Sequence, residues 1–213
     1  MKIALINGSP KFKESASSKL LDMIKDTAVS AGVSEFVEIH FRKDDAPTEE
    51  QLKQLSAADA WIFAYPLYVD GIPGHLLQVL RYLETAGLSN PNRKIYGICN
   101  CGFYEGEQNE SALEVLRNWS TKCGYIWGGA VGVGGGGATL SLTSMGTVGS
   151  VFMGPVSRAV ESLGQAAAEN RVQETRYVSI TLPRWIYTIC AHDGWKKKIK
   201  AAGGKVEDLE RRF

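Results

Sequence analysis

The fold is decided by the stretch Ile3-Ala-Leu-Ile-Asn-Gly-Ser-Pro-Lys-Phe-Lys-Glu-Ser-Ala-Ser-Ser-Lys-Leu20. It opens with four apolar residues and passes at once into turn formers, from Asn7 to Pro10. After a polar loop, apolar residues return at positions 20, 21, 24 and 28, which is the spacing of one helix face. The stretch therefore predicts a buried strand, a loop rich in hydroxyl groups and a helix.

Three serines, Ser15, Ser17 and Ser18, stand where the predicted helix begins. A helix start carries unpaired N–H groups and a partial positive charge, so it is a natural site for phosphate. Serine is also a common helix cap. Two interpretations therefore stay open at this point: the serines only cap the helix, or the loop binds a phosphate.

The composition is that of one globular domain. A chain of 213 residues can bury a substantial core, and 44% hydrophobic with 22% charged residues is ordinary for such a domain. The net charge of +1 provides no strong field for nucleic acid, so we expect no nucleic-acid partner. No run approaches the length of a membrane span and the first residues lack a signal-peptide pattern, so we expect a cytoplasmic protein.

The cysteines and histidines give no metal or nucleophile pattern. Only one residue separates Cys99 from Cys101, whereas zinc and iron–sulfur motifs usually have two or more between ligands. We expect these two, with Cys123 and Cys190, to be reduced and mostly buried thiols. The histidines at 40, 75 and 192 are isolated, so we expect structural or surface roles and no metal site.

Strands and helices alternate along the rest of the first two thirds of the chain. Short apolar or alternating runs are followed by segments with apolar residues at helical spacing. Further strands are predicted at 33–41, 60–65, 94–100 and 125–133, and helices at 48–56, 75–84 and 112–123. This rhythm predicts an α/β fold with a doubly wound, five-stranded parallel sheet.

Three irregular loops follow the predicted strands, at 7–18, 66–74 and 100–107. In a doubly wound sheet, ligands bind outside the carboxyl ends of the strands, and the first loop lies at the predicted point where the strand order reverses. The same edge of the sheet therefore collects all three loops. This agreement favours phosphate binding by the first loop over capping alone.

The loops carry the motifs of a known family. The first reads Gly8-Ser-Pro-Lys-Phe-Lys-Glu-Ser-Ala-Ser-Ser-Lys-Leu20, the second Pro66-Leu-Tyr-Val-Asp-Gly-Ile-Pro-Gly74 and the third Asn100-Cys-Gly-Phe-Tyr-Glu105. Together they resemble the flavodoxin-like NAD(P)H-dependent FMN reductase family, with its G-S-P-[RK]…S-x-[ST]-x-x-L and P-x-Y-x-x-x-x-P loops. The resemblance covers residues 1–130 and implies a flavodoxin-like sheet in the order 2-1-3-4-5.

The resemblance implies which residues bind FMN. In the first loop the phosphate would lie against Ser9, Pro10, Ser15, the backbone of Ala16, Ser17 and Ser18. Ala16 replaces an Asn often present in the family, which removes one side-chain contact. The second and third loops would line the isoalloxazine and its pyrimidine side through Pro66, Leu67, Tyr68, Val69, Asp70, Asn100, Gly102, Phe103 and Tyr104.

The residue types suit a flavin apart from the family likeness. A flavin ring needs flat or apolar side chains on its faces, which Tyr68, Phe103 and Tyr104 would supply. The alternative is that these aromatics only pack the loops. Since the flavin itself carries the hydride chemistry, no catalytic side chain is assigned.

A glycine run, Gly132-Val-Gly-Gly-Gly-Gly137, formally matches the dinucleotide pattern G-x-G-x-x-G. That fingerprint belongs after the first strand and opens a helix, whereas residues 138–154 show no helical period. We therefore expect 138–154 to be a flexible loop near the flavin or at a subunit contact. A helix follows at 155–169.

The chain is predicted to divide into a flavodoxin-like FMN-binding domain, 1–170, and a helical C-terminal extension, 171–213, docked on the core or on a partner. Residues 182–190 are apolar and aromatic, and 195–200 are basic. The favoured interpretation is a helix with a solvated lysine face. The alternative is an interfacial helix at 182–200 that contacts an anionic membrane or a partner chain.

These features predict an FMN-dependent oxidoreductase. It would take hydride from NADPH or NADH and pass electrons to a small-molecule acceptor, which is a flavin, a quinone or a similar compound. One alternative is a flavodoxin-type electron carrier without reductase activity, although such carriers are typically shorter and more acidic. Another is an interaction module that binds no flavin. We expect a homodimer, because a site open on one side is often completed by a second subunit.

Overall fold

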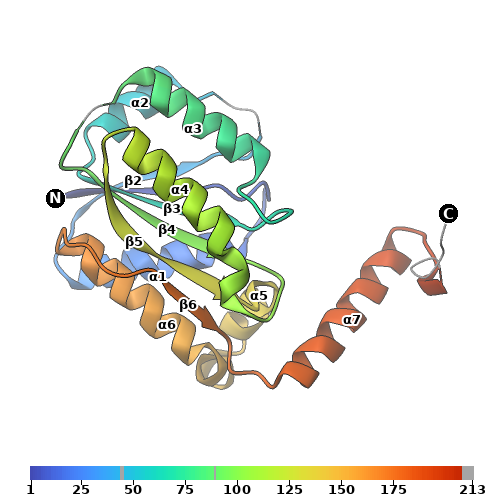
Figure 1. Cartoon of the computed structure of the whole chain (residues 1–213). Helices are drawn as coiled ribbons and strands as arrows, with labels where there is room; N and C mark the ends of the chain where they lie inside the picture. The colour runs from blue at the N-terminus through green and yellow to red at the C-terminus, as the bar shows by residue number, and fades with distance from the viewer. Residues whose placement is uncertain (44–45, 89, 208–213) are drawn as a thin grey trace. The chain divides into compact units, whose positions relative to one another are not determined.

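The computed structural model of the protein describes residues 1–43, 46–88 and 90–207. The chain divides into two compact units, Met1–Ile180 and Thr181–Phe213. The first unit is the α/β domain (Figure 1). The predicted extension at 171–213 lies on both sides of this division, and its residues 208–213 lie outside the described ranges.

A parallel sheet of six strands forms the centre of the described part of the first unit, in the order β2-β1-β3-β4-β5-β6. The predicted class and the order of the first five strands are confirmed, but the predicted number of five strands was wrong. The inner strands β1 and β3 are almost wholly buried, as their continuous apolar runs predict. The strands are β1 Lys2–Asn7, β2 Glu35–His40, β3 Ala60–Pro66, β4 Lys94–Asn100, β5 Ile126–Gly134 and β6 Arg176–Ser179.

The sixth strand was missed because it is short and lies at the edge of the sheet. β6 has four residues, none of them fully buried, and it pairs in parallel with Val131–Gly134 of β5. Four residues carry too few alternating positions for a strand to be recognised from periodicity. Part of the predicted helical extension is therefore strand and belongs to the sheet.

Helices cover both faces of the sheet: α2, α3 and α4 on one, α1 and α6 on the other (Figure 1). The helices predicted at 48–56, 75–84 and 112–123 are confirmed to within two residues at each end. The bounds are α1 Ala16–Ser30, α2 Glu49–Ser56, α3 Gly74–Ala86, α4 Glu110–Lys122, α6 Gly146–Ala168 and the 3-10 helix η1 Gly106–Asn109.

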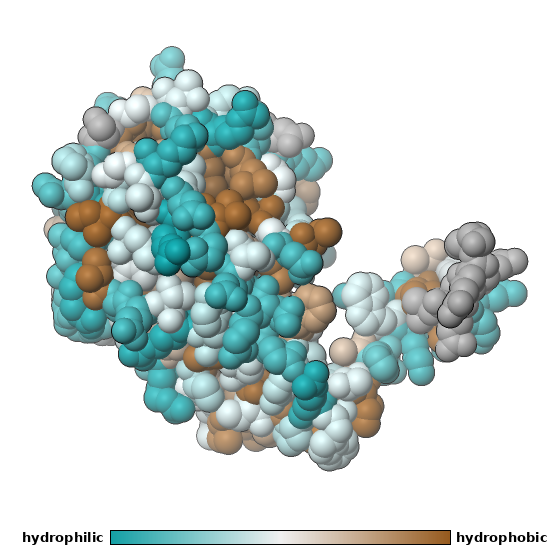
Figure 2. Space-filling view, viewed as in Figure 1, coloured by the Kyte–Doolittle hydropathy of each residue, from teal (hydrophilic) through white to brown (hydrophobic). Residues whose placement is uncertain are grey.

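A large aromatic cluster fills the space between the sheet and the first of these helix layers. Trp61, Phe63 and Trp119 pack there, with the Phe63 and Trp119 rings 5.9 Å apart and edge to face. On the outside, hydrophilic residues cover most of the face drawn in Figure 2, and hydrophobic residues gather where α3 and α4 run side by side. Burial of such aromatic side chains stabilises the packing of this helix layer on the sheet.

The segment expected to be a flexible loop, 138–154, is helical instead. α5 spans Gly136–Ser144, and α6 begins at Gly146 and runs through Pro155. The helix predicted at 155–169 is part of α6, which begins at Gly146, so Pro155 lies inside the helix. A Cβ on Gly149 would lie 1.7 Å from the carbonyl oxygen of Leu142, so the glycine is needed where the two helices meet. The contact between α5 and α6 therefore explains why 138–154 is helical although its sequence has no helical period.

The second unit contains α7, Arg184–Ala201, which confirms that this part of the extension is helical. No residue of α7 is buried. Whether the extension docks on the core or on a partner stays a prediction. Among the described residues, no helix has the length and apolar character needed to cross a bilayer.

The glycine run is explained by close backbone contact with the third loop. A Cβ on Gly134 would lie 2.1 Å from the Tyr104 carbonyl oxygen and 2.6 Å from the Gly106 nitrogen. Gly135, in the left-handed conformation (φ 71°), then turns the chain into α5, and its N–H donates to Phe103 O at 2.6 Å. The run therefore shapes the loop after β4, and it spans the end of the fifth strand and the start of α5 rather than following the first strand.

We predict that Gly134→Ala destabilises the domain by about 1–3 kcal/mol, because backbone atoms of the third loop must move to accept the methyl group. Gly74→Ala is the matched control: its Cβ would meet nothing within 4 Å, so its effect should stay within about 0.5 kcal/mol. Urea unfolding of both variants measures the difference. Equal stabilities would contradict the close contact.

Candidate functional site

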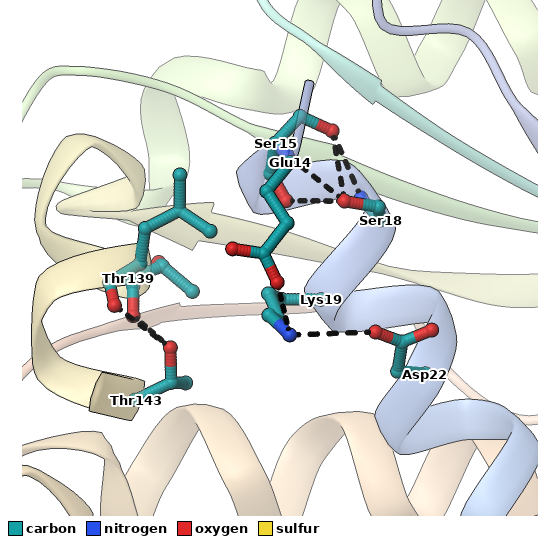
Figure 3. Close-up of polar contacts among 8 residues, drawn as sticks. Glu14, Ser15, Ser18, Lys19, Asp22, Thr139 and Thr143 are labelled. Carbon is teal, nitrogen blue, oxygen red and sulfur yellow. Dashed lines mark hydrogen bonds and ion pairs between the residues drawn. The ribbon is translucent and has the colours of Figure 1, made fainter. Parts of the chain in front are cut away.

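The first loop ends in a capping box at the start of α1. The Ser18 N–H donates to Ser15 Oγ at 3.1 Å, and the Ser15 N–H donates to Ser18 Oγ at 2.9 Å. Figure 3 shows this reciprocal pair. The capping interpretation of these two serines is therefore confirmed, and it leaves the neighbouring N–H groups available to a ligand.

Ala16 and Ser17 occupy the first positions of α1, where backbone N–H groups have no partner within the helix. The helix dipole adds partial positive charge at the same point, and the first turn contains no acidic residue. Glu14, just before the cap, is paired with Lys19 at 2.5 Å (Figure 3). The start of α1 can therefore hold an anion.

Ser9 and Pro10 begin the first loop at the end of β1. The Ser9 N–H donates to Asn7 Oδ1 at 2.9 Å, and Ser9 is buried while Pro10 is half-buried. A Cβ on Gly8 would lie 2.5 Å from Leu76 Cδ2, so only glycine lets the chain pass here without displacing that side chain. The loop is thus closely packed on the side that faces Leu76, and its other side is polar.

His40, at the end of β2, holds the first loop from the side. His40 Nε2 lies 2.7 Å from Ser9 O, and Arg42 Nε donates to His40 Nδ1 at 3.2 Å. Because Nδ1 accepts, we assign the ring proton to Nε2, which donates it to the Ser9 carbonyl. Burial lowers the pKa of His40, which favours this neutral form. Its position at a strand end beside β1 was the signal in the sequence for this supporting role.

Asn100, the last residue of β4, connects the loops. Its buried Nδ2 donates to Ser17 Oγ at 2.9 Å and to the carbonyl of Tyr65 at 3.0 Å. Its own carbonyl accepts from the Leu67 N–H at 2.8 Å. Asn100 therefore links the start of α1 and the end of β3 through its side chain, and the second loop through its backbone.

The second loop makes a tight turn at Tyr68–Gly71, closed by backbone hydrogen bonds in both directions. Val69 and Asp70 both have positive φ, 47° and 56°, which a β-branched valine rarely adopts and which costs about 1 kcal/mol or more. Ser111 Oγ on α4 donates to Asp70 O at 2.5 Å and holds the turn. Pro66 and Leu67 are half-buried, whereas Tyr68, Val69 and Asp70 project into solvent.

The third loop is held from the β5 side. Phe103 O accepts from Gly135, and the Gly106 N–H donates to Ser179 Oγ on β6 at 3.1 Å. Gly102 and Phe103 are exposed and Tyr104 is half-buried. The side chains of Tyr68 and Phe103 are 45% and 54% exposed, so neither is part of the core.

On the other side of the α1 start lies a cavity of about 200 Å³ that does not suit an anion. Asp22 and Glu38 line it together with Ser18 and His40. Burial raises the pKa of Asp22, and neighbouring carboxylates raise it further. The two carboxylates make this cavity unfavourable for a phosphate.

The residues present fit an FMN phosphate at the start of α1. Besides the N–H groups of α1, Thr139 in the first turn of α5 is fully buried, and its Oγ1 has no hydrogen-bond partner among the described residues. α5 contacts α1, and Figure 3 places Thr139 beside that helix. Buried hydroxyls normally have partners, so this buried hydroxyl is a further candidate for a polar contact, and no pattern in the sequence indicated it.

The two cysteines near the site show no sign of a reactive thiolate. Cys99 and Cys101 are buried and free, and burial raises the pKa of both, so neither is a thiolate near neutral pH. Cys123 is half-buried and Cys190 exposed, so burial of the last was wrongly predicted. Within the described ranges, no three histidine, cysteine or acidic side chains come together as a metal site.

The model of the NADPH-dependent FMN reductase family matches residues 1–168. The chain belongs to this family. The match includes all three loops and ends where α6 ends, so the resemblance stated from the loop motifs is confirmed. No curated protein sequence matches the chain.

Three solved structures resemble the fold. An azoreductase from Bacillus anthracis str. Sterne matches with a TM-score of 0.55 at 18% identity, covering 79% of this chain and 98% of its own. A Streptococcus pneumonia TIGR4 flavodoxin gives 0.55 at 13%, covering 79% and 99%. An FMN-dependent NADH-azoreductase from Bacillus anthracis str. Ames Ancestor, solved with FMN, gives 0.51 at 16%, covering 78% and 99%. These matches establish the flavodoxin-like fold.

We predict that Asn100→Ala lowers the free energy of unfolding by about 1–3 kcal/mol, because two buried hydrogen bonds are lost. Ser17→Ala, which removes one of them, should cost less. The double variant should lose less than the sum of the two, since both substitutions break one bond. Asn118→Ala, on the exposed face of α4, is the control. Strict additivity in urea unfolding would contradict the link.

Proposed function

We propose that the protein is an FMN-dependent oxidoreductase that takes hydride from NAD(P)H and passes electrons to a small-molecule acceptor such as a flavin or a quinone. The observation that carries the proposal is the junction at Asn100, which brings the phosphate-type loop and both ring-type loops to one edge of the sheet. Membership of the NADPH-dependent FMN reductase family supports the same assignment.

Each loop has a separate task in this proposal. The N–H groups of Ala16 and Ser17 hold the FMN phosphate, with Ser9 and Ser15 at its side and Ser18 keeping the helix start in shape. The loops beginning at Pro66 and Asn100 contact the ring. Bound FMN would supply the hydride and electron chemistry.

The protein's own contribution is binding and orientation. The turn at Val69 and Asp70 is held in a strained conformation by Ser111, which fixes the edge of the ring site. Tyr68 and Phe103 leave aromatic surface facing solvent, and a nicotinamide or a flat acceptor would stack there. The exposure of Tyr68 and Phe103 suits an enzyme in which the reductant and then the acceptor bind at the same ring site.

The test is the spectrum of the purified protein after addition of FMN. We expect flavin absorbance that stays with the protein and is bleached by NADPH or NADH without oxygen, then restored by a quinone. If neither nucleotide bleaches a flavin that dithionite does reduce, the protein is an electron carrier instead. If no flavin binds, both assignments fail.

We predict that Ala16→Asp raises the Kd for FMN at least about tenfold. A carboxylate at the first helix position is favourable for the helix itself, so the fold is retained, but it repels a phosphate. Riboflavin, which has no phosphate, should bind both proteins equally. Ser30→Asp, at the other end of α1, is the control. Equal losses for FMN and riboflavin would place the phosphate elsewhere.

A further inference from the structure

The residues at the end of β2 hold the first loop at two separate points. At the beginning of the loop, His40 Nε2 donates to the Ser9 carbonyl at 2.7 Å. Further along, the Phe12 ring lies against Arg42 and Lys43, at cation–π distances of 5.3 Å and 5.7 Å from its centroid. Phe12 is 66% exposed, so these contacts, rather than packing in the core, position the middle of the loop.

One hydrogen bond connects the two points. Arg42 Nε donates to His40 Nδ1 at 3.2 Å, so the imidazole accepts a bond on one side and donates to Ser9 on the other. Only a neutral imidazole can do both, because the protonated ring has two N–H donors and no acceptor. We refer to His40 and Arg42 together as the strap. In the form that the structure shows, the strap requires a neutral His40.

A proton on Nδ1 of His40 is incompatible with the bond to Arg42. It would replace the acceptor by a second N–H that faces the Arg42 donor, and it would place two positive charges side by side. Burial lowers the pKa of His40, the bond to the Ser9 carbonyl raises it, and the charges of Arg42 and His75 lower it further. The closed strap therefore resists protonation until the pH falls below 6.5, the ordinary pKa of histidine.

A protonated His40 has other partners within reach. The cavity of about 200 Å³ beside α1 is lined by His40 together with the carboxylates of Asp22 and Glu38. Glu38 lies two residues before His40 in β2, so both side chains are on the same face of the sheet. Asp22 and Glu38 are paired with Lys19 and Lys25, which are partly exposed, so both carboxylates can also attract a positive imidazole. His40 thus has one set of partners when it is neutral and another when it is charged.

We propose that the strap is an acid-sensitive switch, in which a proton on His40 breaks the bond to Arg42 and releases the part of the first loop around Phe12. The proton enters at Nδ1, so the Nε2–H bond to the Ser9 carbonyl is kept and the beginning of the loop stays in place. The charged imidazole then pairs with Asp22 and Glu38. Because the closed strap binds the proton less well than the open one, the closed form prevails at neutral pH and is lost as the pH falls below 6.5.

NMR of the full-length protein tests the switch directly. Titration of the His40 ring gives its pKa, and nuclear Overhauser contacts between the Phe12 ring and the Arg42 side chain report the closed strap. We expect these contacts at about pH 7.5 and their loss at about pH 5, with the same midpoint as the His40 titration and below 6.5. The contact between the Phe63 and Trp119 rings should persist throughout, which shows that the fold is intact. Phe12–Arg42 contacts that survive the titration of His40, or a pKa of His40 at or above 6.5, would overturn the proposal.

Three variants separate the proton on His40 from other effects of acid. His40→Gln can donate and accept without titrating, so it should keep the Phe12–Arg42 contacts at about pH 5. Glu38→Gln removes a partner of the charged imidazole and should move the midpoint to lower pH. His192→Gln, an exposed histidine on α7, is the matched control and should behave as the unaltered protein. Equal loss of the contacts in His40→Gln would assign the acid effect to another group.

The switch also affects the proposed FMN site, and this consequence rests on the proposed function. Release of the loop should speed the dissociation of FMN in acid. The FMN phosphate itself titrates near pH 6, but it does so equally in the unaltered protein and in His40→Gln. We therefore expect the dissociation rate to rise several-fold more in the unaltered protein, and equal rises would contradict control of the flavin by the strap. If no flavin binds, the proposed function fails, while the NMR titration still decides whether the strap opens.

Discussion

The geometry of the site depends on a single buried amide. The loops that follow parallel strands all lie at the carboxyl edge of the sheet, but the sheet itself does not fix the positions of these loops relative to one another. Asn100 does so, because its two N–H bonds reach Ser17 and the Tyr65 carbonyl while its backbone holds Leu67. Each such bond contributes only about 1 kcal/mol to folding, which is small for a domain. Asn100 matters because of where it lies: a shift of this residue would move the first loop away from the second and third loops.

Most of the fold could be predicted because its signals are local. The apolar run of β1, the turn formers after it and the serines at the start of α1 lie within twenty residues, and each corresponds to one structural element. Strand order then placed the three loops together, and the family motifs named Asn100. The bond from Asn100 to Ser17 joins residues 83 positions apart, and no pattern in the sequence indicates it.

What could not be predicted depends on contacts between distant segments. β6 forms because it pairs with the edge of β5. α5 follows Gly134, where the absence of a side chain allows the third loop to lie against the backbone. His40 looked isolated in the sequence, yet the parallel pairing of β1 and β2 brings it to Ser9. In each case the local signal was weak and the tertiary partner decided the outcome.

The reciprocal bonds of Ser15 and Ser18 also affect how the cofactor and the fold are coupled. These bonds are internal to the chain, so the helix start has its final shape before any flavin arrives. Binding then loses little conformational entropy at this point, and release does not require the loop to unravel. The start of α1 is therefore preorganised by the chain itself, and its shape does not depend on a ligand.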